Sequence, residues 1–112
     1  LLCATEKKPF YLDPGARPEN IIECGEDLED DLSDELEEDG EMVAVRISSQ
    51  EDVDSFADCQ YMITKPLCLV CDDAELLERA VRSYQGLALY SGDLSDTELA
   101  PLVENYGIIP LK

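Results

Sequence analysis

The sequence predicts an α/β fold, and two observations support this prediction. Four apolar segments of strand length recur along the chain, at residues 42–47 (MVAVRI), 66–71 (PLCLVC), 87–90 (LALY) and 108–111 (IIPL). The segments before and between them place apolar residues at helical spacing, with short connections. We therefore expect a four-stranded, mainly parallel sheet with alternating helices, either as an open sheet or as a partial TIM-barrel-like arc.

The N-terminal residues form a separate part of this prediction. Two short extended pieces, around residues 10–12 and Ile21-Ile22, flank the turn-rich segment 13–18 (DPGARP). We interpret residues 1–25 as an N-terminal extended segment, either a linker or an edge ribbon, and residues 26–112 as the acidic α/β domain.

The first helix is expected in an unusually acidic segment. Residues 26–41 contain eleven Asp or Glu residues and no basic ones, a composition common in disordered chains. Leu28, Leu32 and Leu36 nevertheless recur every four residues and give one narrow apolar stripe, and Gly40 can end the helix. The sequence therefore predicts a helix that is marginal alone and depends on docking this stripe.

The second helix follows the first strand of the domain. Ser49 with Asp52 three residues later resembles a capping box. The expected apolar face comprises Val53, Phe56, Ala57 and Tyr61. A short strand at residues 61–63 is the alternative for the end of this segment. The next segment, 66–71, is almost continuously apolar, as in a strand buried on both faces of a parallel sheet.

The last two helices carry clear terminal signals. Asp72 or Asp73 can cap the third helix and Gly86 can end it, with Leu77, Ala80, Val81 and Tyr84 on the inner face. Ser95 and Glu98 form a capping box for the fourth helix, Gly107 ends it, and the apolar face comprises Leu99, Leu102, Val103 and Tyr106.

Two prolines bear on the ends of this region. Pro101 is expected in or near the first turn of the fourth helix, where its missing N–H costs least. Pro110 indicates that the last strand lies at an edge or has a pairing left incomplete by truncation.

Composition excludes several classes of function. The 112 residues, 45% of them hydrophobic, suffice for one domain. The net charge of −19 repels phosphate backbones and anionic lipid, so we expect neither nucleic acid nor membrane as a partner. Histidine, the commonest general base and zinc ligand, is absent. We therefore expect no complete catalytic site within the chain.

The five cysteines, an odd number at irregular spacing, favour a reducing, cytoplasmic environment. Cys68 and Cys71 have CxxC spacing, but three residues along a strand place two side chains on opposite faces. We interpret both as structural, with Cys71 the more exposed because it ends the strand. The sequence offers no second Cys or His pair to complete a zinc site, so we predict no metal here.

The ends of two strands supply the candidate ligand-binding residues. Asp72 and Asp73 follow one strand and Ser91 and Gly92 follow the next, at the edge where α/β sheets bind ligands. Helix capping explains the two aspartates equally well. The acidic run lacks the pattern of a calcium loop and is better explained as a solvated helix face. Four tyrosines, Tyr61, Tyr84, Tyr90 and Tyr106, are interpreted as aromatics at the edge of the core.

Residues 66–112 resemble the pterin-binding, dihydropteroate-synthase-like barrel of cobalamin-dependent methionine synthase. In that family a strand ends in an Asp-Ser-Ser-like turn, the next strand ends in Asn-Ser, and the following helix closes on Tyr-Gly, here Tyr106-Gly107. The opening LCATE also resembles the connector that follows the homocysteine-binding barrel of those enzymes. The resemblance implies an arc of βα units.

The family's site residues are mostly replaced. The Asp that hydrogen-bonds the pterin ring falls on Val70, and the Asn of the next strand falls on about Ser91. The Gly-Glu-Arg-Ile-Asn-Pro-Thr-Gly segment of the pterin barrel and the Gly-Gly-Cys-Cys zinc motif of the homocysteine barrel have no counterpart. The resemblance thus implies the fold more strongly than the chemistry.

From this resemblance we expect a non-catalytic accessory domain of a homocysteine S-methyltransferase or methionine-synthase-like protein, degenerate for pterin binding. Its partner would be an upstream methyltransferase domain or a corrinoid protein. The domain itself would hold no cofactor, although the parent protein would use zinc, folate or cobalamin.

Two other hypotheses stay open. The chain is alternatively a stand-alone acidic protein–protein interaction module that engages a basic partner through the helix of Leu28, Leu32 and Leu36. The second alternative is a small-molecule sensor with its site near Asp72, Asp73, Ser91 and Gly92.

Overall fold

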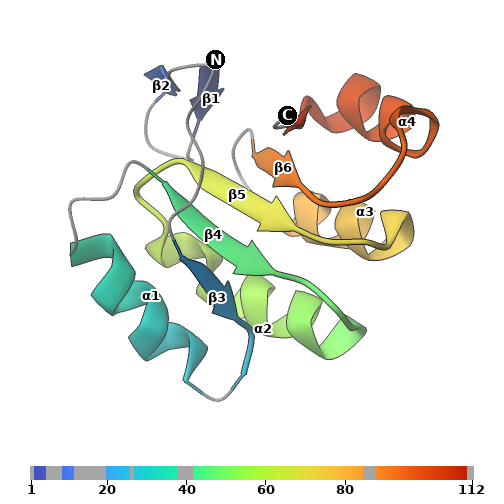
Figure 1. The fold of residues 1–112 in the computed structure, drawn as a ribbon. Coiled ribbons are helices and arrows are strands. Elements are labelled where there is room, and N and C mark those ends of the chain that lie inside the picture. Colours follow the sequence, from blue (N-terminus) through green and yellow to red (C-terminus); the bar gives the residue numbers. More distant parts are fainter. Residues whose placement is uncertain are drawn as a thin grey trace.

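The computed structural model describes residues 2–4, 9–11, 20–25, 27–37, 42–84 and 88–110, the first two ranges by their backbone only. Within these residues the strands are β1 (Leu2–Ala4), β2 (Pro9–Tyr11), β3 (Ile21–Glu23), β4 (Val43–Arg46), β5 (Leu67–Val70), β6 (Leu89–Ser91) and β7 (Ile109–Pro110). The helices are α1 (Leu28–Glu37), α2 (Gln50–Cys59), α3 (Ala74–Ser83) and α4 (Asp96–Tyr106), with a 3₁₀ turn at Gln60–Met62. Figure 1 shows their arrangement.

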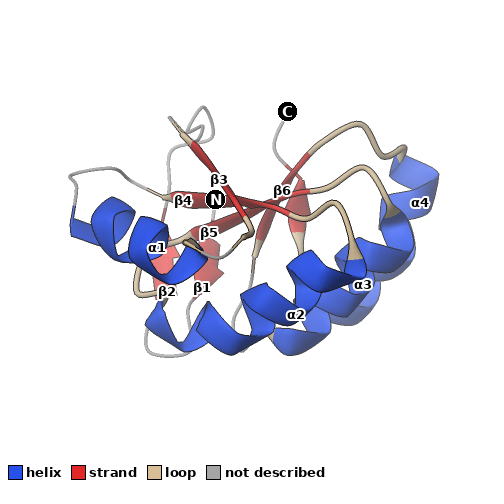
Figure 2. Cartoon of the chain, turned by 90° about the horizontal axis from the view of Figure 1, so that it is seen from below, coloured by secondary structure: helices blue, strands red, loops and turns tan. Residues whose placement is uncertain are grey.

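The centre of the fold is an open parallel sheet in which strands β3 to β7 lie side by side in chain order. A helix connects each strand to the next, and Figure 2 shows the helices together on one side of the sheet. Because crossovers between parallel strands are right-handed and the strand order follows the chain in one direction, all the connecting helices lie on the same face of the sheet. The α/β prediction is confirmed. The described sheet has five strands rather than four, because Ile21–Glu23 pairs with β4 as an edge strand.

The N-terminal strands β1 and β2 form a separate antiparallel pair, with Leu2 opposite Tyr11. The extended character expected around residues 10–12 is confirmed for Phe10 and Tyr11, and Leu12 lies outside the described residues.

The two faces of the sheet carry two separate apolar clusters. Side chains from alternate strand positions, such as Val45 and Leu69, join the helices in the main core. The neighbouring positions Ala44, Cys68 and Leu89 lie on the other face with Met42. Leu67, Cys68 and Leu69 are all fully buried, so β5 is buried on both faces as predicted.

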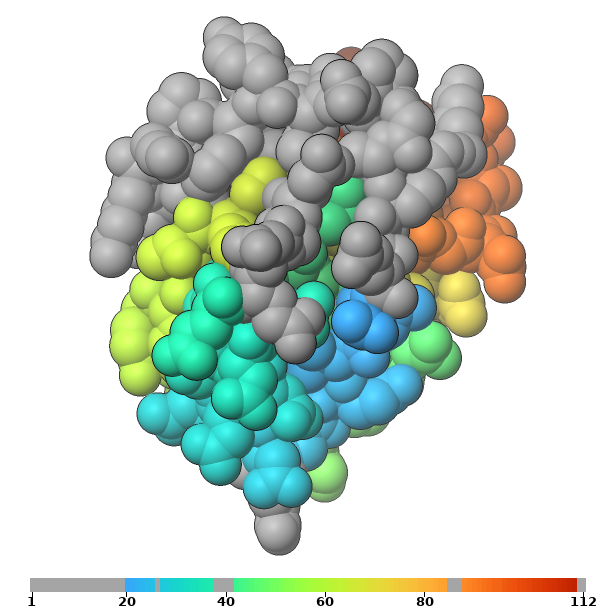
Figure 3. Space-filling model, turned by 60° about the vertical axis from the view of Figure 1, so that its left-hand side comes forward, coloured from blue at the N-terminus to red at the C-terminus, as the bar shows by residue number. Residues whose placement is uncertain are grey.

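Helix α1 docks its leucine stripe as predicted. Leu28 and Leu32 are buried against the sheet, and Leu36 packs against the same core. The acidic residues of α1 are exposed except Glu35, which is half-buried, and Figure 3 shows α1 beside β3 on one face of the molecule. Gly40, the expected helix end, lies outside the described residues.

Helix α2 begins as predicted but ends differently. Ser49 Oγ accepts a hydrogen bond from Asp52 N, and Asp52 Oδ2 accepts one of 2.8 Å from Ser48 N. Val53 and Phe56 are buried, as expected. Residues 60–62 tighten into a 3₁₀ turn, which rotates Tyr61 away from the apolar face and leaves it 59% exposed. The predicted inward position of Tyr61 and the alternative strand at 61–63 are both wrong.

The terminal signals of α3 and α4 are largely confirmed. Asp73 caps α3, Ser95 and Glu98 form both halves of a capping box, and Gly107 ends α4 in the left-handed region with φ 72°. The predicted inner face of α3 is buried: Leu77, Ala80, Val81 and Tyr84. Gly86 lies outside the described residues.

Two details of α4 differ from the prediction. Pro101 is the sixth residue of the helix, in its second turn rather than its first. Because it is exposed, water can satisfy the Thr97 carbonyl that lacks its helical N–H partner. Val103 is also exposed, since Leu99 and Leu102 already fill the contact with the core. Pro110 lies in the edge strand β7, as expected.

Candidate functional site

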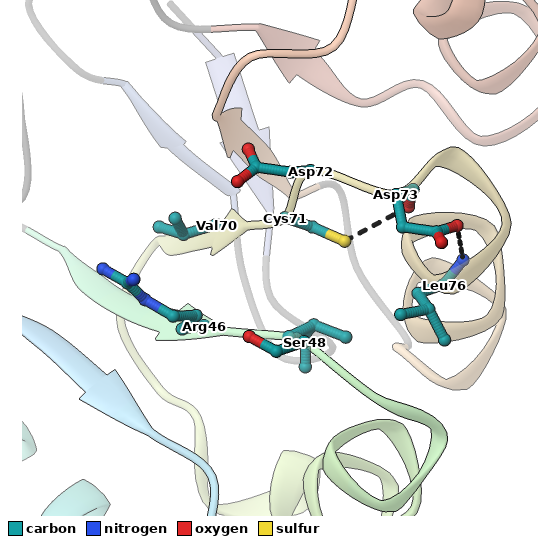
Figure 4. Close-up of a pocket in the computed structure, with 8 residues that line it drawn as sticks. Arg46, Ser48, Val70, Cys71, Asp72, Asp73 and Leu76 are labelled. Carbon is teal, nitrogen blue, oxygen red and sulfur yellow. Dashed lines mark hydrogen bonds between the residues drawn. The ribbon is translucent and has the colours of Figure 1, made fainter.

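A pocket of about 240 Å³ opens at the carboxyl ends of β4 and β5. Parallel strands end at the same edge of a sheet, so the residues that follow them meet there. The end of β4 contributes Arg46, Ile47 and Ser48 to the wall. The end of β5 contributes residues 70–73, and α3 contributes Leu76 (Figure 4).

The strand register sets which residues are neighbours at this edge of the sheet. Arg46 of β4 lies opposite Val70 of β5, and Val70 lies opposite Ser91 of β6. On the other side of Arg46, its Nε lies 3.2 Å from Oε1 of Glu23 in β3. Across the three strands, the ion pair of Glu23 and Arg46 therefore lies next to the aliphatic side chain of Val70.

The two predicted aspartates both line the pocket but have different local roles. Asp73 Oδ1 accepts hydrogen bonds from Glu75 N at 2.9 Å and Leu76 N at 3.2 Å, so this oxygen caps α3. Asp72 Oδ1 accepts one of 3.1 Å from Asp93 N and thereby ties the β5–α3 turn to the β6–α4 loop. Ser91 and Gly92, the other two predicted residues, do not line the pocket.

Tyr90 holds the ends of β5 and β6 together beneath this edge. Its phenolic oxygen donates a hydrogen bond of 2.6 Å to Cys71 O and accepts one of 3.2 Å from Leu94 N. Burial raises the pKa of the Tyr90 phenol. Gly92 lies so close that a Cβ there would approach Cys71 O at 2.5 Å and contact the Tyr90 hydroxyl. Tyr90 and Gly92 therefore hold the ends of β5 and β6 in position beside the pocket.

Cys71 is buried like Cys68, which fits the predicted structural role, although the sequence predicted it to be the more exposed of the two. It is 2% exposed, and its Sγ donates a hydrogen bond of 3.2 Å to Asp73 O. Its side chain lies in the main core together with residues of α3, such as Leu77, so the end of the strand is covered and Cys71 is hardly exposed. Burial raises the pKa of the Cys71 thiol, which makes it a poor nucleophile. Cys68 lies on the opposite face, as expected.

The other two described cysteines, Cys24 and Cys59, are half-buried. Burial, reinforced by Asp52 and Glu23, raises the pKa of Cys24 to about 12. The pKa of Cys59 is raised chiefly by burial as well. These thiols are protonated near neutral pH and are suited to packing rather than to nucleophilic attack.

Arg46 and Ser48 are polar pocket residues that the sequence analysis did not single out. Arg46 ends an apolar strand, and Ser48 lies in the short connection between that strand and α2. The rule that ligands bind beyond the carboxyl ends of parallel strands applies to both. Applied to β4 as well as to β5 and β6, it would have identified them.

Comparison of the chain with family models, curated proteins and solved structures gave no match. In the described part of the chain, none of the helices has the length and apolar character needed to cross a membrane. The role of the site is therefore inferred from its geometry.

Proposed function

We propose that this chain is a non-catalytic accessory domain of a homocysteine S-methyltransferase or methionine-synthase-like protein. Its sheet order supports this proposal. In a (β/α)₈ barrel consecutive strands are neighbours, the helices cover one face, and ligands bind at the carboxyl ends of the strands. Strands β3 to β7 have this order, and their helices cover one face.

The proposed loss of pterin binding depends on Val70. It lies in the pocket wall at the carboxyl end of β5, the place to which the resemblance assigns the pterin-binding carboxylate. An isopropyl group cannot accept hydrogen bonds from the N–H groups of a pterin ring. A buried polar group left without its partner costs roughly 1–3 kcal/mol. The pocket therefore favours a role without folate chemistry.

The proposed role is to pack on a methyltransferase domain or to contact a corrinoid protein in the cytoplasm. The acidic surface of the chain suits a partner with a basic face, because complementary charge speeds and orients association. The parent protein, rather than this domain, would hold zinc, folate or cobalamin.

Sedimentation velocity of the fluorescently labelled chain, mixed in turn with a homocysteine S-methyltransferase barrel and with a corrinoid protein, tests this role. We expect a one-to-one complex with one of them at physiological salt. A basic protein of similar size serves as the control for charge alone. The proposal fails if neither partner binds at about 50 μM, or if the basic control binds equally well.

A stand-alone acidic interaction module is the second candidate function. The structure changes which surface of α1 would bind the partner. Leu28 and Leu32 are buried in the domain itself, so the leucine stripe is already occupied. The outer face of α1 exposes Glu29, Asp30, Asp31, Asp34 and Glu37. This candidate predicts a complex that weakens steeply with salt and requires no methyltransferase partner.

A further inference from the structure

We infer that the pocket at the carboxyl ends of β4 and β5 binds a small zwitterion with an aliphatic side chain, of the class of the hydrophobic α-amino acids. The inference depends on the pocket residues alone and does not require the proposed accessory function. Four features support it: a guanidinium, a carboxylate, an apolar wall, and the charge of the whole chain.

Arg46 supplies the cationic group. Its Nε lies 3.2 Å from Oε1 of Glu23, and within the described residues its two terminal nitrogens make no ion pair. A guanidinium presents these nitrogens as a planar fork that matches a carboxylate. The hydroxyl of Ser48 lies in the same wall and makes no hydrogen bond with the described residues. Together they provide donors for a ligand carboxylate.

Asp72 supplies the anionic group from the other strand. Its Oδ1 accepts from Asp93 N, and within the described residues Oδ2 has no hydrogen-bond partner. Figure 4 shows Arg46 coming from the end of β4 and Asp72 from the turn after β5, with Val70 between them. Asp73 is less suited, because one of its oxygens already caps α3. Asp72 can therefore accept hydrogen bonds from a ligand ammonium group.

Hydrocarbon completes the wall. Val70 and Leu76 are only partly buried and both line the pocket, so they can contact an aliphatic side chain. The volume of about 240 Å³ is below the roughly 300–1,000 Å³ of pockets for drug-sized ligands. This size fits a metabolite as small as an amino acid.

The charge of the chain decides between a zwitterion and a simple anion. At a net charge of −19 the protein repels a free carboxylate. A zwitterion carries no net charge, and its ammonium group is attracted by the same field. Within the pocket, Arg46 then binds the carboxylate of the ligand, and Asp72 binds its ammonium group.

Titration of the full chain by ¹⁵N NMR with three matched probes tests the inference: L-leucine, 4-methylpentanoate, which lacks the amine, and 3-methylbutylamine, which lacks the carboxylate. We expect saturable amide shifts around residues 46–48 and 70–73 with L-leucine. Each analogue should bind roughly tenfold more weakly or worse, because it leaves one charged group without its partner. Absence of saturable shifts with L-leucine, or equal binding of either analogue, would overturn the inference.

Substitutions test whether Arg46 binds the ligand carboxylate and whether Asp72 binds the ligand ammonium group. Arg46→Gln and Asp72→Asn should each weaken L-leucine binding roughly tenfold. Asn at 72 keeps an oxygen for Asp93 N, so the loop is preserved. Arg82→Gln makes the same change in charge on the outside of α3 and should leave binding unchanged. Equal losses in Arg46→Gln and Arg82→Gln would contradict a specific site.

Folding is checked separately by the dispersion of the NMR spectrum. If Arg46→Gln does not fold, Ser48→Ala takes its place, and binding to that variant must weaken for the inference to hold. L-leucine binding by NMR and complex formation in sedimentation velocity are independent measurements, so failure of this inference is distinguishable from failure of the proposed function.

Discussion

The hydroxyl of Tyr90 donates a 2.6 Å hydrogen bond to the carbonyl oxygen of Cys71, 19 residues earlier in the chain. The same oxygen accepts from Leu94 N. One buried side chain thus joins the end of β5, the end of β6 and the loop that leads to α4. The edge of the sheet that carries the pocket depends on this contact.

Tyr90→Phe should therefore destabilise the fold by about 1–3 kcal/mol, because Cys71 O and Leu94 N lose a partner at a buried position. Urea unfolding followed by circular dichroism measures the change. Tyr61→Phe, at a residue that is 59% exposed, is the matched control and should change the free energy of unfolding by less than about 0.5 kcal/mol. Equal effects of the two substitutions would contradict the role of the hydroxyl.

Gly92→Ala should also be destabilising, since the new methyl group would meet Cys71 O and the Tyr90 hydroxyl. We expect a cost of about 1–3 kcal/mol. Gly25→Ala is the control, because nothing lies within 4 Å of a Cβ at that position. In the background of Tyr90→Phe, which removes the clash with the hydroxyl, Gly92→Ala should cost less. Strict additivity in this double-mutant cycle would argue against the contact.

Leu32→Ala should cost about 2–5 kcal/mol, because the side chain is fully buried and its removal leaves a cavity between α1 and the sheet. Urea unfolding gives the value. Ser33→Ala, the next residue on the exposed side, should be close to neutral. A neutral Leu32→Ala would mean that the acidic helix is not docked.

Cys24 should make stability depend on alkaline pH. Its pKa is 9.0 in a model thiol and about 12 in the folded chain, chiefly because of burial. Between these values the unfolded chain releases a proton that the folded chain keeps, so the free energy of unfolding falls as pH rises above about 9. Cys24→Ser removes this titration. The stability of the native chain relative to Cys24→Ser should be constant below that pH and should decrease above it. A relative stability that rises with pH would have the wrong sign.

The main elements of the domain were predictable because their signals are local. The Ser95–Glu98 capping box, the Gly107 end and the leucine spacing of α1 each specify a helix boundary or face within a few residues. The continuous burial of β4 and β5 likewise follows from a local pattern, their almost uninterrupted apolar sequence. These features required no knowledge of distant contacts.

The remaining features depend on tertiary contacts. The segment Ile21–Glu23, extended as predicted, joins the sheet because β4 lies beside it, and Cys71 is buried because α3 folds back over the end of β5. The Tyr90–Cys71 bond joins residues whose proximity follows from the pairing of β5 with β6. Arg46 and Ser48 belong to a pocket only once the strand order is known.

The loss of pterin binding at Val70 is the central claim, and calorimetric titration of methyltetrahydrofolate into the chain tests it most directly. We predict no measurable heat of specific binding up to about 100 μM ligand, because the side chain of Val70 in the pocket wall cannot accept hydrogen bonds from the pterin ring. Saturable binding with a micromolar Kd would contradict the account.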